Sequence, residues 1–76
     1  MADPRIVVDP TIMAGKPVIR GTRIPVHIIL GMIGSGTARD EILREYPQLK
    51  ASDLDAAVLY ASHVMESTDW VEVGVV

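Results

Sequence analysis

The chain has 76 residues, no cysteine and a formal net charge of −3 at neutral pH. This length predicts one small domain, and the lack of cysteine excludes disulfide bonds and thiolate zinc sites. The acidic balance argues against a protein that coats nucleic acid without sequence preference. Hydrophobic residues make up 49% of the chain, more than so small a domain easily buries, so we expect a homodimer.

Residues 1–24 are expected to form a β unit. Arg5 to Val8 predicts a short strand, Val18-Ile19 a second, and residues 22–24 offer a third. Gly21 adopts positive φ without strain, so the residues around it predict a turn. Strands this short need further pairing, and Ile6 and Val8 lie on an edge that a second copy could extend.

Residues 25–67 predict three helices, at about 25–33, 37–46 and 51–66. The first is apolar on nearly every side, so Ile28, Ile29 and Met32 are expected to contact a second copy. Thr37 is the expected N-cap of the second helix. The third helix starts either after Lys50 or, with Ser52 as N-cap, two residues later. Its core stripe is predicted to comprise Leu54, Ala57, Val58, Ala61, Val64 and Met65.

The predicted fold class is mainly α: a short N-terminal β-hairpin unit followed by a three-helix, homeodomain-like helix-turn-helix core. The second and third helices, joined by a short turn that contains Pro47, have the spacing typical of that motif. We expect one domain over residues 1–76, with residues 68–76 as a C-terminal tail. Apolar and polar residues alternate only weakly in this tail, so both a strand and a disordered end are consistent with its sequence.

Seven cations are candidates for contacts to DNA phosphates: Arg5, Lys16, Arg20, Arg23, Arg39, Arg44 and Lys50. The predicted DNA-binding residues are Lys16, Arg20, Arg23, Arg39, Lys50 and, at the start of the third helix, Ser52. The third helix itself has no lysine or arginine, and its exposed residues are expected to include Asp53 and Asp55, which DNA phosphates would repel. A structural alternative is that Arg20 and Arg23 hydrogen-bond carbonyls or carboxylates to hold the turn.

The apolar tail is the candidate surface for a protein partner, through Trp70, Val71 and Val73. The alternative is that Trp70 packs onto the core of its own chain. No membrane span and no signal peptide are predicted, so we expect a cytoplasmic protein.

Enzymatic activity is not expected. Gly15-Lys16 lacks the glycine loop of a phosphate-binding motif and is followed by Pro17, which has no N–H to donate. No spacing suggests a nucleophile with its base. His27 and His63 are too far apart to predict a metal site, and no cofactor is expected.

The string GKPVIRGTRIPV at residues 15–26, preceded by Asp9-Pro10 and Met13, resembles a family catalogued as domain of unknown function 433. The resemblance continues to Tyr60-Ala61 and covers roughly residues 6–62, although Lys50 stands where the family usually has threonine. It implies a helix-turn-helix-like core behind an N-terminal β unit. Some members are similar to VapB-type antitoxins, which are encoded beside a PIN-like nuclease toxin.

The apolar content and the first helix predict a dimer, and analogy with helix-turn-helix proteins predicts a transcriptional regulator that binds operator DNA. The resemblance implies that this regulator is an antitoxin that binds a PIN-like toxin. The alternative is a DNA-silent dimeric protein-interaction module that keeps the fold without a DNA-reading surface.

Overall fold

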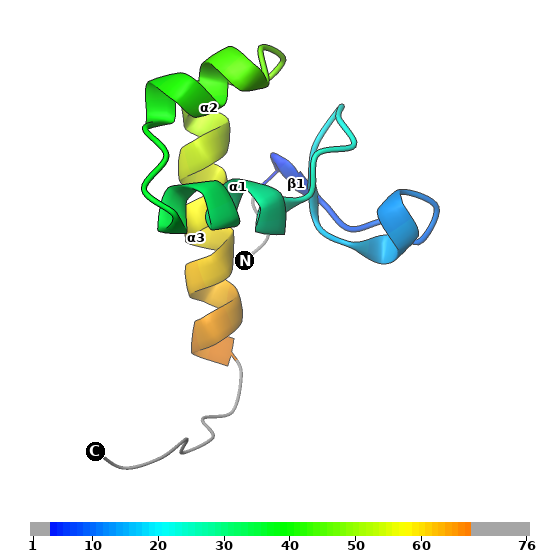
Figure 1. Cartoon of the computed structure of the whole chain (residues 1–76). Helices are drawn as coiled ribbons and strands as arrows, with labels where there is room; N and C mark the ends of the chain where they lie inside the picture. The colour runs from blue at the N-terminus through cyan, green and yellow to red at the C-terminus, as the bar shows by residue number, and fades with distance from the viewer. Residues whose placement is uncertain (1–3, 68–76) are drawn as a thin grey trace, which may run out of the picture.

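The computed structural model describes residues 4–67. Its elements are β1 (Ile6–Val7), η1 (a 3-10 turn, Met13–Gly15), β2 (Val18–Ile19), α1 (Val26–Gly34), α2 (Arg39–Glu45) and α3 (Ala51–Ser67). Figure 1 shows that α1 crosses the middle of α3, that α2 lies at the N-terminal end of α3 and that the β unit lies beside α1. The mainly α fold class with an N-terminal two-stranded unit is confirmed. Trp70, Val71 and Val73 lie outside the described residues.

The β unit is a two-stranded antiparallel sheet in which Ile6 pairs with Ile19 and Val7 with Val18. The predicted third strand at residues 22–24 is wrong. The Thr22 hydroxyl donates to the Ile19 carbonyl at 2.7 Å and accepts from the Ile24 N–H at 3.0 Å, so these residues close a turn. Gly21, at φ +79°, supplies the left-handed residue that this turn needs.

The junction between α1 and α2 explains a second error. The N–H of Thr37 donates to the Met32 carbonyl and that of Gly36 to the Ile33 carbonyl, with Gly36 at φ +88°. This pair of hydrogen bonds is the Schellman motif that closes a helix C-terminus. Because Thr37 belongs to the end of α1, Ala38 takes the N-cap position of α2 and no side chain caps that helix.

The turn between α2 and α3 is fixed by its own backbone and by one buried side chain. The Tyr46 N–H donates to the Ile42 carbonyl and the Leu49 N–H donates to the Tyr46 carbonyl, both at 2.9 Å. Leu49 is 5% exposed and joins the core. Helix α3 begins at Ala51, so the alternative start with Ser52 as N-cap is wrong.

The core lies where the β unit and all three helices meet. Its most deeply buried large side chains are Val18, Ile19, Ile29, Ile42 and Leu54. The prediction that Ile29 contacts a second copy is wrong, because its side chain is fully buried within the chain itself. The pairing of a second copy with the edge strand that contains Ile6 stays a prediction. Met32 is also partly buried against this core. Of the predicted dimer residues, Val8 and Ile28 remain exposed, at 57% and 38%.

The predicted core stripe of α3 is confirmed only for its first half. Leu54 and Ala57 are fully buried, and Ala56 joins them. Further along the helix, Val58, Val64 and Met65 are 43%, 42% and 58% exposed. Figure 1 shows the C-terminal part of α3 extending beyond α1. The described part of the chain therefore covers the stripe at one end and leaves it open at the other.

Candidate nucleic-acid interface

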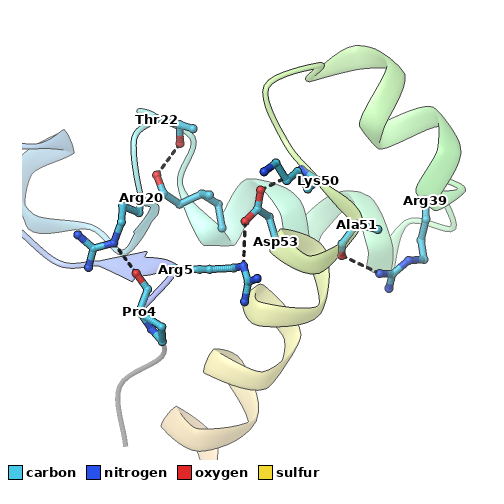
Figure 2. A network of polar contacts seen from close by, with 9 residues as sticks. Pro4, Arg5, Arg20, Thr22, Arg39, Lys50, Ala51 and Asp53 are labelled. Atoms are coloured by element: carbon cyan, nitrogen blue, oxygen red, sulfur yellow. Dashed lines mark hydrogen bonds and ion pairs between the residues drawn. The ribbon is translucent and has the colours of Figure 1, made fainter.

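The first turn of α3 is the centre of a polar network (Figure 2). The backbone N–H of Lys50 donates to Oδ2 of Asp53 at 2.9 Å, so the carboxylate satisfies a donor just before the helix. Oδ1 of Asp53 lies 3.7 Å from Nε of Arg5, which comes from the residue before β1. Asp53 thus ties the start of α3 to the N-terminal strand.

Arg39 makes a second link to the same turn. Its Nη2 donates to Oδ1 of Asp55 at 2.7 Å and to the Ala51 carbonyl at 3.1 Å (Figure 2 shows the second contact). Arg39 is the first residue of α2, so this side chain joins the starts of two helices. Both charged side chains are about half exposed or more, so the pair adds little stability but sets the local charge.

These contacts correct the expectation that the start of α3 presents free acidic groups. Asp53 is only 9% exposed. Its carboxylate accepts a hydrogen bond from the Lys50 N–H and pairs with the Arg5 guanidinium. The Asp55 carboxylate is paired with Arg39. Since Arg5, Arg39 and Lys50 outnumber these two carboxylates, the start of α3 has a net positive charge.

The structure separates the predicted DNA-binding residues into different surroundings. Lys50 is exposed and Ser52 half-buried at the start of α3, and Arg39 lies beside them. Lys16 is exposed and lines a groove with residues of α1 and α3. The six predicted residues therefore do not form a single cluster.

Arg20 and Arg23 have different environments. Nε of Arg20 donates to the Pro4 carbonyl, and its backbone N–H donates to the Arg5 carbonyl at 2.7 Å (Figure 2 shows the first contact). The structural alternative is therefore supported for Arg20, which holds the N-terminal segment. Arg23 is exposed in the turn, and no contact to it from another side chain is seen among residues 4–67.

Arg5 was not among the residues predicted to bind DNA. It joins the network only because the pairing of β1 with β2 brings its side chain to the first turn of α3. The available signal was the acid at the third position after Lys50, since an acid there commonly accepts the N–H before the helix. That pattern identifies Asp53 as a capping residue, but it does not show which cation pairs with it.

Other titratable groups do not form a site in the part of the chain that the structure describes. The N–H and the hydroxyl of Thr11 both donate to Oδ1 of Asp9, at 2.8 and 2.7 Å, and hold the pKa of that carboxyl below its ordinary value. Over residues 4–67, no group of three or more histidines and acids is placed to hold a metal ion. None of the described helices is long and apolar enough to cross a membrane.

We expect Asp53→Ala to lower the free energy of unfolding by about 1–3 kcal/mol, since it leaves the Lys50 N–H without its acceptor and Arg5 without its counter-charge. Asp53→Asn retains an acceptor oxygen and should cost less than half as much. Urea unfolding followed by circular dichroism compares the two variants. Equal losses for both would show that the ion pair, rather than the hydrogen bond, dominates.

These observations define a class: a small, mainly α protein in which a two-stranded unit packs on three helices and supplies an arginine to the start of the third. The chain belongs to the DUF433 family, described as a protein of unknown function, whose profile matches residues 6–61.

The chain is similar to three further proteins. The uncharacterised protein y4eO of Sinorhizobium fredii is 36% identical over 53 residues, which cover 70% of this chain and 24% of that protein. An uncharacterised protein of Archaeoglobus fulgidus is 73% identical over 22 residues, or 29% of this chain and 61% of that protein. The crystal structure of a DUF433 member from Anabaena variabilis superposes with a TM-score of 0.76 at 37% identity, covering 82% of this chain and 61% of that one. The chain thus spans less than two thirds of each relative.

Proposed function

We propose that the protein is a small, dimeric DNA-binding regulator of the antitoxin type, without enzymatic activity. The observation that carries this proposal is the charge at the start of α3. Arg5 pairs with the carboxylate of Asp53, and Arg39 pairs with that of Asp55, both near the start of α3. Lys50, just before the helix, is exposed. A cationic helix start can approach a phosphate, whereas the acidic start expected from the sequence would be repelled.

The arrangement of α2 and α3 supports the same proposal. In helix-turn-helix proteins the start of the second helix enters the major groove while the first helix crosses the DNA backbone. Here Ile42 and Leu49, both buried, hold α2 and the turn against α3. Arg39 joins the starts of the two helices. Because a fold alone does not assign a function, the charge arrangement is the stronger argument.

A DNA-silent interaction module is the second candidate, and a specific observation favours it. Asp40, Glu41 and Glu45 are exposed on α2, close in sequence to the cation that would approach DNA. With the net charge of −3, these acids could cancel the local attraction of the α3 start.

A salt titration distinguishes the two candidates. The full chain is titrated with the DNA upstream of its own gene and with a scrambled duplex of equal length, by fluorescence anisotropy. If each chain neutralises two or three phosphates, a fourfold rise in salt should weaken binding by about tenfold or more. The scrambled duplex should bind more weakly at every salt concentration. Equal affinity for both duplexes, or no binding at low salt, would favour the interaction module.

The toxin partner in this proposal is supported by the resemblance to antitoxins. Co-purification with the product of the adjacent gene tests it. A stoichiometric complex with a PIN-like nuclease supports the antitoxin type, and its absence would leave a regulator without a toxin.

A further inference from the structure

The turn of residues 20–23 presents two arginines from a closed backbone. It follows β2 directly and precedes the segment that leads into α1. The N–H and the hydroxyl of Thr22 both donate to the Ile19 carbonyl, at 3.0 and 2.7 Å, so the turn is held from inside. Arg20 and Arg23 are both exposed on it. The turn therefore holds two cations at defined places on the surface.

A continuous series of contacts joins this turn to α3 (Figure 2). The backbone N–H of Arg20 donates to the Arg5 carbonyl at 2.7 Å, and Nε of Arg20 donates to the Pro4 carbonyl. Nε of Arg5 lies 3.7 Å from Oδ1 of Asp53. The other carboxylate oxygen of Asp53 accepts the Lys50 N–H at 2.9 Å. These contacts fix the position of the turn relative to the first turn of α3.

Cations outnumber acids along this series of contacts. We name as the cationic row the five residues Arg5, Arg20, Arg23, Arg39 and Lys50, out of seven lysines and arginines in the chain. The two carboxylates beside them, those of Asp53 and Asp55, are each paired with an arginine. The chain as a whole has a net charge of −3. A local excess of positive charge on an acidic protein attracts a polyanion to that surface alone.

We propose that the turn of residues 20–23 makes a second contact with duplex DNA, in which Arg20 and Arg23 bind the phosphate backbone next to the site approached by the start of α3. The guanidinium group suits this role, because its N–H donors match the oxygens of a phosphate. Nε of Arg20 is used by Pro4, and no acceptor for its two terminal nitrogens is seen among residues 4–67.

A second backbone contact has a defined purpose. Contacts to phosphates set the orientation of a protein on the duplex, whereas contacts to base edges read the sequence. The start of α3 alone leaves the helix free to rotate about one point of contact, and the turn would remove that freedom. The inference rests on the DNA binding in the proposed function and adds this contact to it.

Lys16 provides a control within the same β unit. It is exposed, like Arg23, but it lines the groove between α1 and the second half of α3, together with Tyr60 and Val64. It therefore lies outside the cationic row. Neutralising Lys16 or Arg23 changes the total charge by the same amount, so a difference between the two variants reports on position.

Fluorescence anisotropy of the full chain with the upstream and scrambled duplexes tests the proposal. Arg23→Ala should weaken binding roughly fivefold to tenfold at about 0.1 M salt and lower the salt slope by about one. The loss should be the same for both duplexes, because a phosphate contact does not read the sequence. Lys16→Ala should stay within about twofold of the wild type. Arg23→Lys keeps the charge and should retain most of the affinity.

Four results would overturn the proposal, and they differ in what they leave standing. Equal losses for Arg23→Ala and Lys16→Ala would show that total charge governs binding. No effect of Arg23→Ala, with Lys50→Glu weakened, would keep the contact at α3 and exclude the turn. A loss confined to the upstream duplex would indicate a contact to bases instead of phosphates. A wild type that binds neither duplex at low salt would exclude DNA binding itself. Thermal unfolding of each variant should match the wild type, since both substituted side chains are exposed.

Discussion

Leu54→Ala is expected to lower the free energy of unfolding by about 2–5 kcal/mol and to leave much of the protein unfolded at 37 °C. Leu54 is fully buried and packs in the cluster that joins the β unit to all three helices. Its truncation removes apolar contacts and leaves a cavity that the surrounding elements fill only in part. A domain this small has a low free energy of unfolding, so this loss is a large part of the total.

Urea unfolding followed by circular dichroism measures this loss. The control is Leu59→Ala, a chemically identical change on the same helix at a side chain that is 53% exposed. We expect the control to change the free energy of unfolding by no more than about 0.5 kcal/mol. Equal effects at the two positions would contradict the assignment of Leu54 to the core.

Lys50→Glu is expected to weaken binding to the upstream DNA by about tenfold or more and to lower the salt slope by about one. The change replaces a projecting cation with an acid at the helix start, next to the carboxylates that Arg5 and Arg39 neutralise. The fold should be retained, because Lys50 contributes its backbone N–H to Asp53 and an acid is favourable at the positive end of a helix.

Arg44→Glu provides a charge-matched control for Lys50→Glu. Arg44 is exposed in the last turn of α2, whereas Arg39, at the first position of that helix, is the residue that contacts α3. We expect Arg44→Glu to weaken DNA binding less than Lys50→Glu does. If both variants lose affinity equally, total charge governs binding and the start of α3 has no special role.

Local patterns in the sequence were sufficient for most of the fold. The β-branched pair Val18-Ile19 forms β2 as expected, and helical periodicity with Pro47 and the Gly34–Gly36 break locates all three helices to within about two residues. These features depend on neighbours along the chain. Thr37 shows the limit, because whether it caps α2 or ends α1 is decided by hydrogen bonds to Met32 that the capping pattern alone does not reveal.

The candidate site was less predictable, since it depends on which side chains meet in space. Arg5 and Asp53 are 48 positions apart in the sequence, yet they lie 3.7 Å apart in the fold. Charge counted along the third helix therefore overstated its acidity. The apolar character of α1 likewise could not show which of its faces is buried: Ile29 is fully buried while its neighbour Ile28 is 38% exposed.

We propose that the start of α3 is the surface that contacts DNA. This is tested by NMR titration of the ¹⁵N-labelled full chain with the upstream duplex. We predict the largest shifts at the amides of Lys50, Ala51 and Ser52 and at the side chains of Arg5 and Arg39, with little change at Val64 and Met65. Shifts confined to the second half of α3, or no shifts at low salt, would show that the start of α3 does not contact DNA.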